Sequence, residues 1–307
     1  MLPQVLEYIQ PKNGEVYVDG TFGAGGYSRA LLEAANCMVY AIDRDPDVAV
    51  TAKKLMELFP NRFFWLTGNF SDMVELLAEQ GIDKVDGIVL DIGVSSMQID
   101  NAERGFSFRH NAALDMRMSK NGRTAADIIN NYDEEELANI IYKYGDERKS
   151  RHIANAIIKE RANGLIKTTS QLAEIVRRVV RGGDGIDPAT RTFQALRIEV
   201  NDELGELERA LSAAELLLKP SGRLVVVTFH SLEDRIVKNF FKSRSGETRG
   251  VSRHLPSREE THGKAADRLP AFFLMNKKAV LPDKSEISQN SRSRSAKLRS
   301  AIRSEAL

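Results

Sequence analysis

The chain has 307 residues, of which 42% are hydrophobic, so it is long enough for more than one average domain and apolar enough for a sizeable core. Its 44 Lys and Arg residues nearly cancel its 43 Asp and Glu residues, which excludes a uniformly basic surface. The single cysteine excludes an internal disulfide framework and a thiolate zinc cluster, and no apolar run reaches the roughly 18 residues of a membrane span.

Two further features of the sequence concern metals and location. The five His residues form no pair at metal-ligand spacing, so we expect no metal site. The N-terminus lacks a basic segment followed by an apolar one. We therefore expect a soluble protein of the reducing cytoplasm.

Short apolar runs alternate with helical patterns in the first third of the chain. Strands are predicted at residues 16–22, 38–44, 63–69 and 87–94. Helices are predicted at residues 28–35, 46–59 and 71–80. Strand and helix in turn predict right-handed crossovers and a parallel sheet.

After Val94 the alternation stops, and helix follows helix for about a hundred residues. These helices are predicted at residues 133–144, 147–161, 170–181 and 188–200. Asp133 and Glu136 have capping-box spacing at the start of the first of them, and Gly145 is its expected stop. Residues 182–188, GGDGIDP, have the composition of a loop.

Alternation then resumes. A helix is predicted at 202–218, a turn at 220–222, a strand at 223–229 and a helix at 231–241. The fold class is therefore α/β, with one domain formed by residues 1–100 and 206–307 and a mostly helical insertion at 101–205. Residues 244–270 are predicted to form a mobile loop and 272–280 a last strand, whereas the basic segment 290–303 has no clear pattern.

The charge is unevenly distributed along the chain. Residues 1–100 hold 7 basic and 15 acidic side chains, whereas residues 235–307 hold 17 basic and 7 acidic side chains. An anionic polymer would therefore be attracted to the C-terminal part and not to the first hundred residues. A solvated basic tail is an equally weighted alternative.

A glycine-rich turn follows the first predicted strand. In the run DGTFGAGG, Asp19 ends the strand and Gly25 and Gly26 close the turn before a helix. Such glycines let backbone N–H groups approach a ligand at the carboxyl ends of a parallel sheet. The spacing is not G-x-G-x-x-G, which counts against a nicotinamide or flavin cofactor and favours the looser loop of S-adenosylmethionine enzymes.

The next three strand ends also carry polar or aromatic groups. Asp43 ends the second strand, where an acid can accept hydrogen bonds from ribose hydroxyls, and Asp45 can cap the following helix, which leaves Asp43 for a ligand. Phe70 follows the third strand, where adenine stacking and core packing are nearly equal alternatives. Asp91 ends the fourth strand. We expect these groups to meet in one crevice.

Several long strings carry a resemblance to a known family: DGTFGAGG, AIDRDP, LDIGVSS, ERGFSF with LDMRM, PATRTFQALRIEVNDEL and FHSLEDRIVK. Together they resemble the bacterial 16S ribosomal RNA cytosine-N4 methyltransferase family, from about Val16 to Arg303. The resemblance implies a Rossmann-like sheet that binds S-adenosylmethionine and an inserted helical domain that recognises the substrate. The implied reaction methylates the N4 amine of a cytidine in the decoding region of 16S ribosomal RNA.

The resemblance also implies partners and site residues. The expected partner is 16S ribosomal RNA within the small ribosomal subunit, with no membrane, and a homodimer is left open. The implied cofactor-binding residues are Gly25, Gly26, Tyr27, Asp43, Phe70, Asp91 and Gln98. Tyr27 stands where the family often has His, and Met97 where it often has Pro, so a ring is kept at position 27 but an imidazole is not.

Candidates for contact with the substrate lie further along the chain. Asp115, in LDMRM, is the candidate for contacting the target amine or its leaving proton, and an ion pair with Arg117 is the alternative. His230 follows the fifth strand, where a substrate-facing group is expected, and Ser231 is the expected cap of the next helix. Residues that could hold an extruded base or the RNA backbone, or belong to the core or surface instead, are Phe106, Phe108, Arg109, Arg191 and Arg197.

Two other functions remain as alternatives to an RNA methyltransferase. One is a ribosome-assembly module that keeps the cofactor pocket without catalysis. The other is methylation of a small molecule or a protein, which the basic C-terminal third disfavours.

Overall fold

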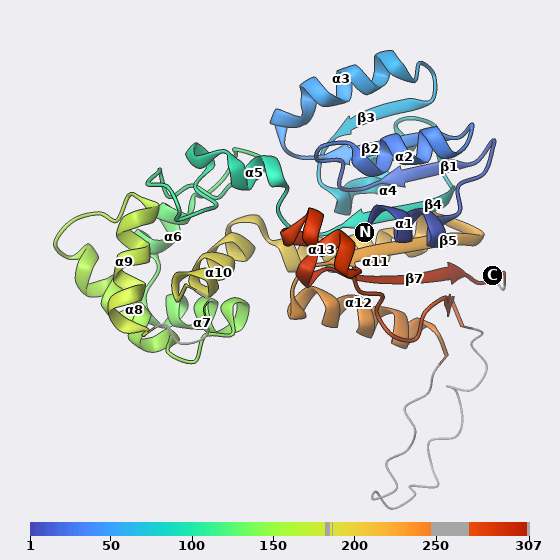
Figure 1. Ribbon diagram of the computed structural model, residues 1–307. Coiled ribbons are helices and arrows are strands. Elements are labelled where there is room, and N and C mark those ends of the chain that lie inside the picture. The colour runs from blue at the N-terminus through green and yellow to red at the C-terminus, as the bar shows by residue number, and fades with distance from the viewer. Residues whose placement is uncertain (182–184, 186, 247–269, 306–307) are drawn as a thin grey trace, which may run out of the picture. The chain divides into compact units, whose positions relative to one another are not determined.

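The structure is a computed structural model that describes residues 1–181, 185, 187–246 and 270–305. The chain forms two compact units (Figure 1). Unit 1 consists of residues 1–43, 48–92 and 206–307, and unit 2 of residues 44–47 and 93–205. Most of the predicted loop at 244–270, and four of the seven residues of the predicted loop at 182–188, lie outside the described residues.

Unit 1 is built on a seven-stranded sheet in the order β3-β2-β1-β4-β5-β7-β6 (Figure 1). The strands are β1 (Val16–Asp19), β2 (Met38–Asp43), β3 (Phe63–Thr67), β4 (Val85–Asp91), β5 (Leu218–Thr228), β6 (Phe272–Leu274) and β7 (Lys297–Arg303). The first five strands in the chain run parallel, and β7 runs antiparallel to both β5 and β6. The predicted α/β fold class is therefore confirmed. Because the strand order reverses between β1 and β4, the carboxyl ends of these two strands form the switch point where open sheets bind ligands.

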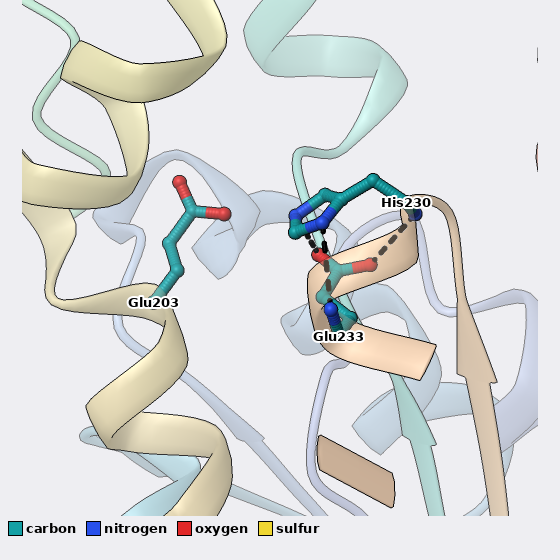
Figure 2. Close-up of side chains that lie close together, drawn as sticks. All are labelled: Glu203, His230 and Glu233. Carbon is teal, nitrogen blue, oxygen red and sulfur yellow. Dashed lines mark hydrogen bonds and ion pairs between the residues drawn. The ribbon is translucent and has the colours of Figure 1, made fainter. Parts of the chain in front are cut away.

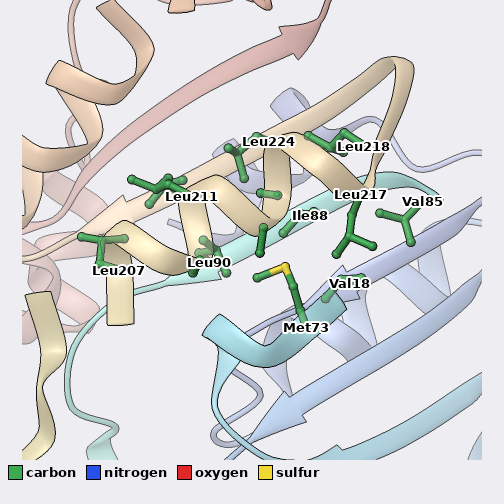
Figure 3. Close-up of a cluster of buried hydrophobic side chains, with 14 of the residues drawn as sticks. Val18, Met73, Val85, Ile88, Leu90, Leu207, Leu211, Leu217, Leu218 and Leu224 are labelled. Atoms are coloured by element: carbon green, nitrogen blue, oxygen red, sulfur yellow. The ribbon is translucent and has the colours of Figure 1, made fainter. Parts of the chain in front are cut away.

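Helices cover both faces of this sheet. They are α1 (Leu2–Ile9), α2 (Gly26–Ala34), α3 (Ala49–Leu58), α4 (Met73–Ala78), α11 (Glu203–Leu217) and α12 (Ser231–Arg244). Unit 1 also contains α13 (Lys284–Gln289) and the 3-10 turns η2 (Phe70–Asp72) and η4 (Ser291–Ser295), whereas two of the three residues of η1 (Pro46–Val48) belong to unit 2. Side chains alternate along β4: Ile88 and Leu90 join the core under α4 and α11 (Figure 3), whereas a Cβ on Gly87 would lie 2.8 Å from Ile9 of α1. None of the described helices is long and apolar enough to cross a bilayer.

The C-terminal strands differ from the prediction. β5 begins five residues early and contains the predicted turn, where Ser221 has a φ of 63°. The predicted strand at 272–280 is reduced to the three residues of β6. β7 was not predicted, because its Lys and Arg residues hide the strand pattern. In the structure Arg299 Nε donates to Asp234 Oδ1 at 2.8 Å, and Arg303 donates to the Ala271 carbonyl at 2.8 Å.

Unit 2 is mostly helical. Its elements are α5 (Ser96–Asp100), η3 (Ala102–Arg104), α6 (Ala125–Asn131), α7 (Glu134–Gly145), α8 (Ser150–Arg161), α9 (Thr169–Val179) and α10 (Ala189–Asn201). The predicted capping box of Asp133 and Glu136 is present. Gly145 is not the stop of α7 as predicted: it is the last helical residue, and Asp146 adopts the left-handed conformation after it. Gly145 is required for space instead, since a Cβ there would lie 2.6 Å from the carbonyl oxygen of Arg191.

Candidate functional site

The loop of residues 20–25 joins β1 to α2 at the switch point, and two strand-end carboxylates fix its path. Asp19 is fully buried at the end of β1 and accepts hydrogen bonds from the Thr21 N–H at 3.2 Å and from the Ser28 N–H and hydroxyl at 3.1 and 2.7 Å. Asp43, at the end of β2, accepts a hydrogen bond from the Gly23 N–H at 2.7 Å. The loop is therefore held by its side-chain partners as well as by its glycines.

Two of the glycines have different physical roles. Gly25 has a φ of +77°, and a Cβ there would lie 2.9 Å from the ring of Phe22, so both backbone conformation and space require glycine. A Cβ added at Gly26, the first residue of α2, would meet no atom within 4 Å. The backbone at Gly26 therefore borders open space and can be approached by a ligand.

The division of roles between Asp43 and Asp45 is partly as expected. Asp45 Oδ1 accepts a hydrogen bond from the Asp47 N–H at 3.0 Å and so caps the 3-10 turn η1, whereas α3 itself begins at Ala49 with Val48 as its N-cap. The expectation that Asp43 is left wholly to a ligand is wrong, because its Oδ2 holds Gly23. A rigid loop needs this brace, since a loop with several glycines has many alternative conformations.

Asp91 ends β4 beside the same loop. Its N–H donates to Thr21 Oγ1 at 2.7 Å, and the nearby Tyr27 hydroxyl acts to lower the pKa of its carboxyl group. Its Oδ1 atom is buried and has no hydrogen-bond partner among the described residues. Burial, and next the charge of Asp19, raise the pKa of Asp91 to about 7.

Three carboxylates thus converge on the loop. Burial raises the pKa of Asp19 to about 6, despite the opposing hydrogen bond from Ser28, and the charge of Asp43 adds to the increase. The pKa of Tyr27 is also raised, first by burial and then by the charges of Asp91 and Asp19. Because negative charge accumulates here, the edge favours a ligand that carries N–H groups or a positive charge.

Phe70 lies beside the beginning of the loop. It is half-buried in η2, and a Cβ on Gly20 would be 3.3 Å from the Phe70 Cβ atom. The Gly68 N–H donates to the Asp43 carbonyl at 3.2 Å, which joins the end of β3 to the end of β2. The structure therefore brings six of the seven predicted cofactor residues, all those in unit 1, to the border of one loop.

Gln98, the seventh, lies in unit 2 and is buried. Its side-chain oxygen accepts a hydrogen bond from the Ser95 N–H at 3.0 Å as part of a capping box, and its Nε2 donates to Asp45 Oδ2 at 2.7 Å. An amide nitrogen carries two hydrogens, so the second N–H is the group that Gln98 can still offer to a ligand.

A buried arginine that was not among the predicted site residues organises this part of unit 2. Arg104 Nη1 contacts Asp45 at 2.9 Å and Asp47 at 2.7 Å, and its Nη2 donates to the carbonyls of Arg117 and Met118, both at 2.9 Å. It therefore connects the short segment 44–47 to the LDMRM string. The rare string ERGFSF contains Arg104, but no local pattern distinguishes it from a surface arginine.

Asp115 forms the ion pair with Arg117 that was the predicted alternative to contact with the substrate. Arg117 donates to it through Nε at 2.9 Å and Nη2 at 2.7 Å, and its backbone N–H donates at 2.9 Å. Burial acts to raise the pKa of Asp115, but the hydrogen bonds and charge of Arg117 outweigh it, and the pKa is lowered. The ion pair engages both carboxylate oxygens.

His230 follows β5 and turns toward its own helix. Figure 2 shows its imidazole beside the carboxylate of Glu233: Nε2 lies 2.8 Å from Oε1, and Nδ1 accepts the Glu233 N–H at 3.4 Å. Glu233 is fully buried and its Oε2 also accepts the Phe229 and His230 N–H groups. The expectation that Ser231 caps the helix is wrong, because His230 is the N-cap and Ser231 is the first helical residue.

The predicted RNA-contacting residues are divided between the core and the surface of unit 2. Phe106 and Phe108 pack against its core, and Phe108 meets Phe193 edge to face at 4.8 Å. Arg197 pairs with Glu203 at 2.8 Å. The two that are exposed are Arg109 and Arg191, the latter 3.6 Å from Glu147.

The model of the MraW methylase family matches residues 1–304 of the chain. The chain belongs to the MraW methylase family. It is 56% identical over 306 residues to the ribosomal RNA small subunit methyltransferase H of Rhodospirillum rubrum, with 99% of this chain and 93% of the relative covered. It is 57% identical over 307 residues to the protein of the same name from Paramagnetospirillum magneticum, with 100% and 95% covered.

Solved structures resemble this MraW-family chain more distantly. An rRNA methylase from Streptococcus thermophilus is 9% identical with a TM-score of 0.42, and the alignment covers 96% of this chain and 90% of that one. The family membership confirms the resemblance that the sequence strings carry.

Proposed function

We propose that this member of the MraW methylase family transfers a methyl group from S-adenosylmethionine to the N4 amine of one cytidine in the decoding region of 16S ribosomal RNA. The observation that carries the proposal is the braced glycine loop at the switch point, beside which one carboxylate oxygen of Asp91 has no hydrogen-bond partner within the described part of the chain. Its substrate would be the RNA within the small ribosomal subunit in the cytoplasm. Self-association into a homodimer stays a prediction.

The residues around the loop fit the donor. Gly25, Gly26 and Tyr27 would line its amino-acid part, where the backbone is open at Gly26. The ribose hydroxyls would donate to Asp43, and the half-buried ring of Phe70 would lie against the adenine. Gln98 would add its remaining N–H.

Asp91 would hold the charged end of the donor. S-adenosylmethionine, when bound, supplies a methyl group on a positively charged sulfur and also carries an ammonium group. A buried carboxylate with an open oxygen is a suitable acceptor for that ammonium group.

Transfer to nitrogen is an in-line displacement, so the chain's main task is to hold the amine opposite the departing sulfur. The contacts of Asp115 do not support it as the acceptor for the amine's hydrogens, because both of its carboxylate oxygens accept hydrogen bonds from Arg117. Asp115 therefore stays a prediction, and the structural ion pair is the alternative that its geometry favours. Unit 2 is proposed to recognise the RNA around the target.

Calorimetric titration with S-adenosylmethionine tests the cofactor assignment. We expect saturable heat from the wild type and a large loss of affinity in Asp43→Ala. Because Asp43 also braces Gly23, Asp43→Asn is the matched variant: it keeps an oxygen for the Gly23 N–H and removes only the charge and one acceptor. Wild-type affinity in Asp43→Ala would contradict the assignment.

The alternative function is a ribosome-assembly module without catalysis. The modification state of the RNA distinguishes it from the methyltransferase. Mass spectrometry of small-subunit RNA from a deletion strain should show a missing N4-methylcytidine, restored by the wild-type gene. An intact methylcytidine would favour the assembly module.

A further inference from the structure

The outward face of α12 carries positive charge and no acid. The exposed residues of this helix are Ser231, Arg235, Lys238, Asn239, Lys242 and Ser243. The opposite face is buried through Val237, Phe240 and Phe241. The helix is therefore fixed to unit 1 by an apolar face and presents three cations to solvent.

The acidic side chains of α12, and Glu215 of α11, contact partners other than these three cations. Glu233 is fully buried next to His230. Asp234 pairs with Arg299 at 2.8 Å and with Lys297 at 3.5 Å. Glu215, on α11, pairs with Arg244 at 3.1 Å. The positive charge of the outward face is thus not cancelled by the acids of its own helix.

Three of the exposed residues have the spacing i, i+3 and i+7 and therefore share one side of the helix: Arg235, Lys238 and Lys242. We call these three residues the α12 stripe. With a rise of 1.5 Å per residue, the stripe extends for about 10 Å. Among the described residues, no acid forms an ion pair with any of the three. α12 begins three residues after Thr228, and Val227 pairs with Asp91 across β5 and β4, so the helix starts at the edge that carries the loop.

We propose that the α12 stripe binds the phosphate backbone of the RNA substrate along a line that leads away from the edge that carries the glycine loop. The inference rests on the proposed function and adds a docking surface in unit 1 to it. Lys and Arg side chains make most phosphate contacts, and these contacts position the RNA without reading its sequence. The exposed residues of α12 are only Ser, Asn, Lys and Arg, whereas the centre of a protein–protein interface is depleted in Lys and Ser and enriched in aromatic residues.

The test compares Lys238→Gln/Lys242→Gln with Lys53→Gln/Lys54→Gln. Lys53 and Lys54 are exposed on α3 of unit 1, so both variants remove two lysine charges from a helix surface of the same unit. Binding of naked small-subunit ribosomal RNA and of assembled small subunits is measured between about 50 and 200 mM salt, the range over which phosphate contacts change affinity most. Calorimetry with S-adenosylmethionine reports whether the loop of each variant is intact.

We expect the stripe variant to bind naked RNA about tenfold more weakly at about 50 mM salt, with a log–log salt slope shallower by about 2, because each phosphate contact contributes about 1 to the slope. The α3 variant should bind RNA like the wild type, and all three proteins should bind S-adenosylmethionine equally. An unchanged slope, or an equal loss in both variants, would overturn the proposal. A loss seen only with assembled subunits would also overturn it, since the stripe would then contact a ribosomal protein.

The same data separate the docking surface from the function on which it rests. If the wild type methylates the RNA and the stripe variant binds and methylates it equally well, the proposed function is supported and the docking surface is refuted. A wild-type chain that binds S-adenosylmethionine but neither binds nor methylates the RNA overturns the function and the docking surface together.

Discussion

Replacing Asp91 by Asn should make the stability of the protein less sensitive to a rise in pH from about 4 to about 7. Asn is nearly the same size and keeps one oxygen for hydrogen bonding, but it carries no charge. In the folded chain the pKa of Asp91 is raised from 3.8 to about 7, first by burial and then by the charge of Asp19. About three pH units correspond to about 4 kcal/mol of cost for ionising this carboxylate in the folded state.

The sign follows from proton binding. Between pH 3.8 and about 7 the folded state holds a proton on Asp91 that the unfolded state has lost. The free energy of unfolding therefore decreases as pH rises through this window and levels off above it. From about pH 5 to about pH 8, these two pKa values give a decrease of about 2.5 kcal/mol, which Asp91→Asn should remove.

Urea unfolding at these two pH values measures this difference. The matched control is Asp83→Asn, which removes one carboxylate from an exposed position of the same unit and should keep the pH dependence of the wild type. The pKa of the nearby Asp19 is also raised, to about 6, so Asp91→Asn should keep the part of the pH dependence that Asp19 contributes. If Asp91→Asn unfolded with the same pH dependence as the wild type, Asp91 could not be the group that carries the raised pKa.

Two other perturbations follow from the same geometry. Gly25→Ala should lower the free energy of unfolding by about 1–3 kcal/mol, because Gly25 has a φ of +77° and lies against the ring of Phe22. Gly26→Ala should fold as well as the wild type but bind S-adenosylmethionine more weakly. Urea unfolding measures the first effect and calorimetry the second. Arg104→Leu should lower the free energy of unfolding by about 3–5 kcal/mol, since it removes the cation from the buried carboxylate of Asp45, and wild-type stability in urea would contradict that role.

The sheet could be predicted where local periodicity reflects burial. β1, β2 and β4 are buried on both faces and therefore have continuous apolar runs, which are typical of parallel strands. β7 has a Lys or Arg at three of its seven positions, and only partners far away in the chain make it a strand. Arg299, for example, is neutralised by Asp234, 65 residues earlier. A window of neighbouring residues contains no information on such a pairing.

The site shows the same division between local and distant causes. The ends of parallel strands lie at one edge of a sheet, so Asp43, Phe70 and Asp91 could be predicted as neighbours of the glycine loop from the strand pattern and the family resemblance. That Asp43 braces Gly23 could not be predicted, because it depends on the path of a loop with several permitted conformations. The buried position of Arg104 was also missed, since an arginine in a polar string is normally exposed.

The contacts of the strand-end acids explain why one of them is suited to a ligand and another to the fold. Asp19 accepts three hydrogen bonds from Thr21 and Ser28, so its oxygens are occupied by the chain itself. Asp91 is equally dependent on burial for its raised pKa, but one of its oxygens has no partner among the described residues. An unpaired buried oxygen costs folding free energy unless something binds it. In the binding mode proposed above, the ammonium group of the donor would pair with this oxygen of Asp91 and would remove that cost.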